Sequence, residues 1–148
     1  MICVADTNVL LTFFWKQSVL RSIITKQKLR LYAPEYALEE IKKYKEEIKK
    51  RTQLSKEEFK KIHQELVSQV TFIPLEKYIP SFSIVIGASQ EFSSDEKKME
   101  MLRDIDFLAL SKQLNCCLWS NDKLLKRQHI LQVLNTKEIV TIIQDNTD

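Results

Sequence analysis

Short apolar runs alternate with longer stretches of mixed apolar and polar residues along this chain. Five of the runs are brief, rich in β-branched or aromatic residues, and bounded by turn or capping residues, a pattern that favours buried strands. The predicted strands are residues 2–5, 29–33, 70–73, 116–119 and 139–143. The segments between them have helical patterns, and strands that alternate with helices indicate a mostly parallel sheet covered on both faces.

Capping signals mark several helix starts between these strands. Ser55 with Glu58, and Ser93 with Glu96, match the capping box, in which each side chain binds the other residue's backbone N–H. Pro34 suits the first turn of a helix, where its missing N–H costs nothing. We therefore predict an α/β sandwich of three layers around a central, mostly parallel sheet of about five strands.

Length and composition agree with a single soluble domain. The chain has 148 residues, of which 44% are hydrophobic and 29% charged, which is ordinary for a globular protein. No apolar run approaches the roughly 20 residues of a transmembrane helix, and the N-terminus lacks the basic start and cleavage site of a signal peptide. We expect one domain over residues 1–148, with no membrane contact and in the cytoplasm.

The glycine and cysteine content excludes two common kinds of site. The sequence contains one glycine, Gly87, so it has no glycine-rich loop of the kind that binds phosphate in P-loop and Rossmann proteins. Cys3, Cys116 and Cys117 have neither C-x-x-C spacing nor neighbouring histidines, so zinc is not indicated and we expect reduced core cysteines. The chemistry of this chain must come from other side chains.

Asp6 and Asp122 each follow a predicted buried strand. The carboxyl ends of parallel strands meet at one edge of a sheet, where open α/β sheets bind their ligands. Both carboxylates should lie at this edge if their strands are neighbours. For Asp6 alone, a simpler interpretation is that Asp6 or Thr7 caps the following helix, but a second strand that ends on an acid favours a shared site.

Two further acids border apolar surfaces. Glu40 lies beside the apolar stripe of the helix predicted after the second strand, whereas Glu39 points away from that stripe. Asp104 precedes a strongly apolar helix, and burial of an unpaired carboxylate is costly. Asp104 and Asp106 therefore need either a basic partner, such as Arg103 or Lys123, or a metal ion.

A cluster of carboxylates requires a cation, because like charges held close together raise each other's pKa. Oxygen ligands without histidine or thiolate favour Mg²⁺ or Mn²⁺ over zinc. Such ions bind phosphate oxygens and activate water for attack on phosphorus. The acids thus indicate hydrolysis of a phosphodiester, by one metal ion or by two.

Four motifs that cover nearly the whole chain together resemble the PIN domain family. They are residues 4–10 around Asp6 and Asn8, residues 34–41 around Glu40, residues 104–110 starting at Asp104, and residues 118–123 around Ser120 and Asp122. The resemblance implies a PIN-like three-layer sandwich and a metal-dependent ribonuclease. It also implies that the protein is similar to the toxins of VapBC-type toxin–antitoxin pairs, which form a large group of the family.

The resemblance assigns roles to individual residues. The catalytic metal ligands that it implies are Asp6, Glu40, Asp104 and Asp122. Asn8 and Ser120 would support these ligands by hydrogen bonds. Asp106 departs from the family pattern, which often has proline there, and adds an acid beside the pocket. Because residues two apart on a helix point about 200° apart, we expect Asp104 and not Asp106 to be the ligand.

RNA, an antitoxin protein and a second copy of the chain are the partners that this resemblance implies. Residues 42–61 carry nine basic and four acidic side chains, a net charge of +5. This segment could guide an RNA backbone to the acids, although an ordinary solvated surface has the same pattern. Phe13, Phe14 and Trp15 are more typical of a core or a protein interface than of base stacking, and we favour an interface.

Two alternatives from other functional classes stay open. The chain could be a catalytically silent PIN module that binds RNA or a protein, although the complete set of acids favours an enzyme. It could also be a nuclease for DNA or for a particular nucleic-acid structure, because the sequence does not reveal contacts to a 2′-hydroxyl.

Overall fold

The computed structural model describes residues 1–26 and 28–146. Within these residues one parallel sheet has the strand order β3-β2-β1-β4-β5. Its strands are β1 Ile2–Ala5, β2 Arg30–Pro34, β3 Thr71–Ile73, β4 Cys117–Trp119 and β5 Val133–Leu134. The first four begin and end within one residue of predicted strands, so the predicted α/β class and parallel sheet are confirmed.

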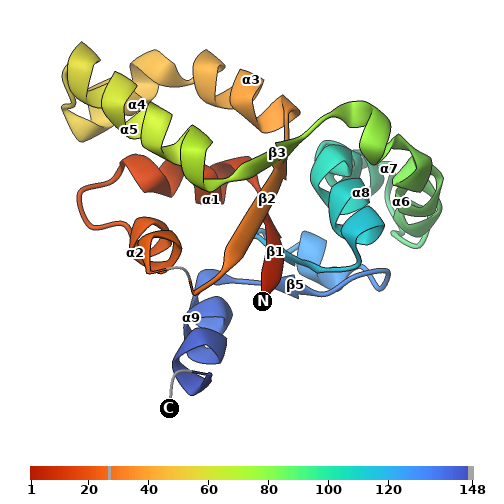
Figure 1. Cartoon of the computed structure of the whole chain (residues 1–148). Coiled ribbons are helices and arrows are strands. Elements are labelled where there is room, and N and C mark those ends of the chain that lie inside the picture. Colours follow the sequence, from red (N-terminus) through yellow and green to blue (C-terminus); the bar gives the residue numbers. More distant parts are fainter. Residues whose placement is uncertain (27, 147–148) are drawn as a thin grey trace.

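Helices cover both faces of this sheet (Figure 1). On one side α8 packs against β1, β2 and β4, and α6 packs on α8; α1 to α5 lie on the other side (Figure 1). The α-helices are α1 Thr7–Leu11, α2 Val19–Thr25, α3 Tyr36–Lys43, α4 Lys45–Thr52, α5 Lys56–Gln69, α6 Phe82–Ser89, α7 Asp95–Leu102, α8 Ile105–Leu114 and α9 Thr136–Asp145. Short 3₁₀ helices span Thr12–Phe14, Leu75–Lys77, Ile79–Ser81 and Leu125–Arg127.

The prediction of a fifth strand at residues 139–143 is wrong, because these residues belong to α9 and the strand beside β4 is β5. Asn135 and Glu138 form a capping box: Asn135 Oδ1 accepts the Glu138 N–H at 2.8 Å, and Glu138 Oε1 accepts the Asn135 N–H at 3.0 Å. The run is β-branched, which favours a strand, but only Ile139 is fully buried. The cap and this one-sided burial stabilise a helix.

Two of the three predicted helix starts are shifted. Ser55 forms the predicted capping box with Glu58. However, Ser94 and not Ser93 caps α7. Pro34 is the last residue of β2, where the next residue, Glu35, continues the ladder by donating its N–H to the Ile73 carbonyl at 2.9 Å. A proline at a strand end removes no necessary hydrogen bond, which explains its place there.

The core lies between the sheet and its helices. Its largest fully buried side chains include Trp119, Tyr78, Phe13, Phe14 and Phe107. The three cysteines are unpaired thiols; Cys3 is buried as predicted, whereas Cys116 and Cys117 are partly exposed. In the described ranges, no helix is both long and apolar enough to cross a membrane.

The strand order decides where ligands can bind. The chain runs from β1 outward through β2 to β3 and then returns to the other side of β1 with β4, so the order reverses between β1 and β4. Ligands of open α/β sheets bind at such a switch point, beyond the carboxyl ends of the strands. The Asp6 N–H donates to the Trp119 carbonyl at 3.2 Å, so the ends of β1 and β4 lie side by side. The expectation that Asp6 and Asp122 share one edge of the sheet is thereby confirmed.

Candidate active site

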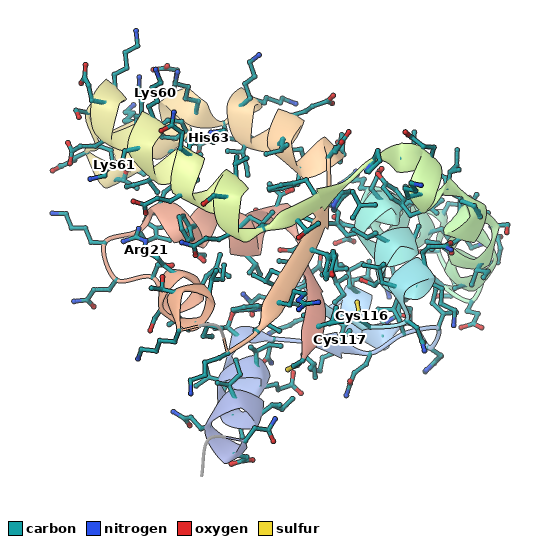
Figure 2. All side chains as sticks on the ribbon, viewed as in Figure 1. Arg21, Lys60, Lys61, His63, Cys116 and Cys117 are labelled. Carbon is teal, nitrogen blue, oxygen red and sulfur yellow. The ribbon has the colours of Figure 1, made fainter. Side chains whose placement is uncertain are left out.

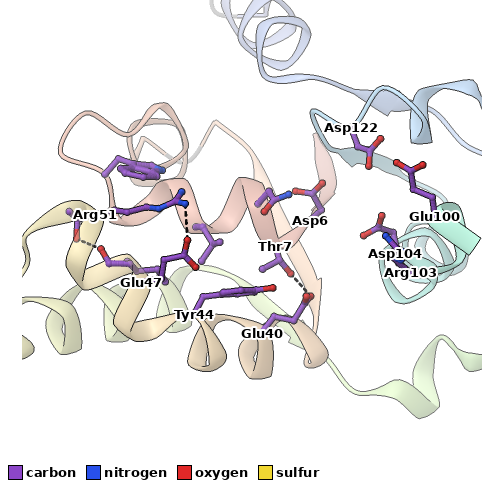
Figure 3. Close-up of a pocket in the computed structure, with 15 residues that line it drawn as sticks. Asp6, Thr7, Glu40, Tyr44, Glu47, Arg51, Glu100, Arg103, Asp104 and Asp122 are labelled. Carbon is purple, nitrogen blue, oxygen red and sulfur yellow. Dashed lines mark hydrogen bonds and ion pairs between the residues drawn. The ribbon is translucent and has the colours of Figure 1, made fainter.

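A cavity of about 580 Å³ opens at this edge of the sheet, and Figure 3 shows the side chains that line it. All four acids singled out in the sequence are among them. The acidic residues of the lining are Asp6, Glu40, Glu47, Glu100, Asp104 and Asp122. The cavity also receives Thr7, Asn8, Trp15, Tyr44, Arg51 and Arg103.

Asp6 is almost completely buried at the end of β1, where it caps α1. Its Oδ1 accepts the N–H of Val9 at 2.9 Å, so the capping interpretation and the cavity position both apply. Burial raises the pKa of Asp6, and the negative charges of Asp122 and Glu40 raise it further. Hydrogen bonds from Ser120 and Val9 act in the opposite direction. The cap fixes the carboxylate while its neighbours disfavour its charge.

Ser120 connects the acids that follow the two strands. Its hydroxyl hydrogen bonds to Asp6, and its Oγ accepts the Asp122 N–H at 3.1 Å. Asp122 in turn accepts the Leu124 N–H through Oδ1 at 2.8 Å. These hydrogen bonds support the segment after β4, from which Asp122 lines the cavity.

Glu40 reaches the cavity from α3. Its Oε1 accepts a hydrogen bond from the Thr7 hydroxyl at 2.6 Å, which joins α3 to the start of α1 (Figure 3). Its neighbour Glu39 is exposed and does not line the cavity. The apolar stripe of the sequence thus separates these two glutamates as predicted.

Asp104 stands just before α8 and faces the other acids across the cavity (Figure 3). Burial raises its pKa to about 7, and the charges of Asp6, Asp122, Glu40 and Glu100 contribute in the same direction. Within the described residues, neither Arg103 nor Lys123 forms an ion pair with it, and no donor hydrogen bonds to its carboxylate. The salt-bridge explanation of this partly buried acid is therefore not supported.

Asp106 does not line the cavity. Its Oδ1 accepts a hydrogen bond at 2.6 Å from the hydroxyl of Tyr78, whose side chain is fully buried. Asp104 and Asp106 do face different surroundings, but the helical angle is not the reason. Asp104 has φ −104° and ψ 21° and precedes the first helical residue, so the angle between residues within a helix does not apply to it.

Several residues of the cavity have no strong signal in the sequence. Thr7 could have been suspected from its place beside Asp6, and Glu100 from its position four residues before Asp104, on a neighbouring turn. Nothing local distinguishes the cavity residue Trp15 from its buried neighbours. Asn8 lines the cavity as expected, but its side chain makes no hydrogen bond with the described residues.

The donor set suits a hard divalent cation. The acids supply only oxygen ligands, burial and the neighbouring acids raise the pKa of Asp104, and in the described chain no ion pair involves Asp6, Glu40, Asp104 or Asp122. Among the described side chains, no three acidic, histidine or cysteine groups converge into a complete ligand set. Mg²⁺ usually retains several waters and binds only one or two carboxylates directly, so acids that do not form a complete ligand set are compatible with such an ion.

Comparisons with known proteins agree with this architecture. The PIN domain family model matches residues 4–141. No curated protein matches the chain. A chain in the crystal structure of VapBC2 from Rickettsia felis bound to a DNA fragment from their promoter is similar, with a TM-score of 0.62, 15% identity, and coverage of 91% of this chain and 98% of that chain. At this identity the likeness concerns the fold, whereas the family model covers most of the sequence: the chain belongs to the PIN domain family.

Proposed function

We propose that this PIN domain is an endoribonuclease that depends on Mg²⁺ or Mn²⁺ and hydrolyses RNA phosphodiester bonds in the acidic cavity. One observation carries the proposal: carboxylates from four separate segments line a single cavity at the switch point of the sheet. These residues are Asp6, Glu40, Asp104 and Asp122. PIN domains are nucleases, and among the described residues none of these four acids forms an ion pair, so their gathering is costly unless it serves a bound cation.

Each residue has a defined task in this proposal. The four carboxylates would hold the cation, directly or through its retained waters, and the cation would supply an activated water molecule and stabilise the charge that develops on the phosphate. Thr7 orients Glu40 through its hydroxyl, and Ser120 holds the chain between Asp6 and Asp122. The capping bond from Val9 restricts Asp6. These bonds fix the acids before substrate arrives, which reduces the cost of ordering them during reaction.

The fold shared with a chain of VapBC2 supports a more specific role. We propose that the protein is the toxin of a VapBC-type pair, that it acts in the cytoplasm as a homodimer, and that an antitoxin binds it. A small reading frame beside its gene should then encode a protein that copurifies with it and suppresses cleavage. If the neighbouring reading frame encodes no such protein, a general ribonuclease is the better description.

Substitution of the acids tests the proposed chemistry. Asp6→Asn and Asp122→Asn should each lower Mn²⁺-dependent cleavage of a labelled single-stranded RNA by about a hundredfold or more. Asparagine can still cap α1, so folding should survive, as circular dichroism would show. The matched pair Glu40→Gln and Glu39→Gln adds a control, because only Glu40 lines the cavity. Cleavage that persists in both aspartate variants would contradict the assignment.

A further inference from the structure

The cavity has two chemically different ends. Asp104, Asp122 and Glu100 lie at one end, whereas Arg51 and Glu47 lie at the other, with Tyr44 between them and Glu40 (Figure 3). Trp15 and two aliphatic side chains, Leu11 and Ile48, also line the cavity. The carboxylates alone supply the proposed metal ligands. The aromatic and aliphatic side chains of the cavity are therefore available to contact a different portion of the substrate.

Trp15 differs from the other large aromatic residues around it. It is 40% exposed, while Phe13 and Phe14 of the same segment are 0% and 1% exposed. Within the described part of the chain its ring pairs with no other aromatic ring, and its indole N–H has no acceptor. Trp119, by contrast, is buried and donates its indole N–H to Thr136 Oγ1 at 3.0 Å. An aromatic side chain that is left open in a cavity is available to a ligand.

The backbone at Trp15 is nevertheless well held. The guanidinium of Arg21 donates to the Trp15 carbonyl at 2.8 Å and also to the Phe13 carbonyl (Figure 2 labels Arg21). It also lies over the Phe13 ring, 5.3 Å from the centroid. These hydrogen bonds hold the backbone that carries the exposed indole. Less conformational entropy is then lost when a ligand binds.

Tyr44 presents a second exposed ring at the junction of α3 and α4. It is 37% exposed, and the Lys43 ammonium lies 5.9 Å from its ring centroid. Arg51 extends into the same end of the cavity and pairs with Glu47 at 2.7 Å. Aromatic rings beside cations are the usual means by which proteins bind unpaired nucleotides, since bases stack on the rings while cations meet the phosphates.

We propose that Trp15 and Tyr44 form a stacking site for unpaired bases of the RNA strand whose phosphate reaches the acids. This inference rests on the proposed function. Paired bases already stack on their neighbours within a duplex, so they cannot offer their faces to these rings. The net charge of +5 over residues 42–61 favours a polyanion here over a basic peptide.

Tryptophan fluorescence can test this site directly, because Trp15 and Trp119 are the only tryptophans and Trp119 is 1% exposed. A single-stranded decaribonucleotide, added in EDTA so that it is not cleaved, should quench the emission of Trp15. Trp15→Leu should weaken its binding about tenfold, while Trp15→Phe should stay within about threefold of the wild type. Leucine retains apolar bulk without a stacking face, so this pair separates stacking from simple apolar contact.

Tyr44→Leu should likewise weaken binding, whereas Tyr36→Leu should not, because Tyr36 is 41% exposed but does not line the cavity. An abasic oligomer of equal length should show no dependence on Trp15. The proposal is overturned if Trp15→Leu binds the decamer as tightly as the wild type, or if a duplex quenches equally well.

The two proposals can fail separately. Binding that depends on Trp15, in a protein that cleaves no RNA with Mn²⁺, would refute the proposed function and retain the stacking site. If Trp15→Leu cleaves RNA with the rate and the KM of the wild type, the proposed function is retained and the stacking site is refuted. If Trp15→Leu lowers the affinity for a peptide encoded by the neighbouring reading frame but not the affinity for RNA, the stacking site is overturned. Such a result would identify the rings as a protein contact.

Discussion

Asp104 and Asp106 provide a sharp comparison at the scale of single residues. Asp104→Asn should lower Mn²⁺-dependent RNA cleavage by about a hundredfold or more, because it removes a carboxylate from the cavity. Asp106→Asn should retain most activity, since an asparagine oxygen can still accept the hydrogen bond from Tyr78. Cleavage assays with Mn²⁺ titrations of both variants make the comparison, which is internally controlled because each removes one charge near the start of α8.

A greater loss in Asp106→Asn would show that the third ligand is misassigned. Equal, partial losses would have a different meaning. They would indicate that the Tyr78–Asp106 bond positions Asp104 by fixing the first turn of α8. Tyr78→Phe, which deletes only the hydroxyl, should then reproduce the loss.

The raised pKa of Asp104 predicts how pH affects the metal-free protein. Its pKa is about 7 in the folded state against 3.8 for an ordinary aspartate, so the folded state binds the proton more tightly. The resulting stabilisation is fully present below about pH 4 and is lost as pH rises through 7. The free energy of unfolding by urea in EDTA should therefore fall between pH 5 and 8.

Asp104→Asn supplies the control for this titration. The variant cannot titrate at this position, so the difference in unfolding free energy between wild type and variant reports Asp104 together with its interactions with the neighbouring acids. This difference also cancels the contribution of His63, whose pKa burial lowers and which acts with the opposite sign. A pH-independent difference would show that Asp104 has an ordinary pKa.

At the scale of elements, α4 and α5 carry a basic surface beside the cavity. Lys60 and Lys61 project from α5 (Figure 2), and Lys50 is exposed on α4. In the described chain none of the three forms an ion pair, whereas Lys49 pairs with Glu46. These lysines are therefore available to contact phosphates.

Replacement of Lys50, Lys60 and Lys61 by glutamine should weaken binding of single-stranded RNA. If all three contact phosphates, the slope of log affinity against log salt should become shallower by about 2. The control variant replaces Lys26, Lys28 and Lys137, which are exposed and do not line the cavity. Filter binding between 50 and 200 mM salt measures both. An unchanged slope would show that the basic surface is merely solvated.

At the scale of the whole molecule, the proposed cation should stabilise the fold. It would bind acids that only the folded chain brings together, and a ligand at 100 times its Kd adds about 2.7 kcal/mol to the free energy of unfolding. For a chain of this size that corresponds to a rise in Tm of roughly 5–10 °C. Thermal melts with EDTA or millimolar Mn²⁺ would measure it. Asp122→Asn should lose the rise and Glu39→Gln should keep it; no rise in the wild type would count against the site.

The sequence by itself determined the class of fold and the candidate acids. The residues of β1 to β4 and the cap at Ser55 follow from hydrophobic period and capping, which depend on neighbours in the chain. Asp6 and Asp122 could be singled out because each follows an apolar strand. Two local signals disagreed in α9. Its β-branched composition favours a strand, whereas the cap at Asn135 favours a helix, and the segment forms a helix.

Only the tertiary structure decided which of these residues meet. β1 and β4 are far apart in sequence but adjacent in the sheet, and this places Asp6 and Asp122 together. Packing also decided that Trp15 opens into the cavity, that Thr7 binds Glu40 across 33 residues, and that Asp106 binds Tyr78 across 28. Such contacts form only when separate elements pack on a common core, so no local pattern of side chains encodes them.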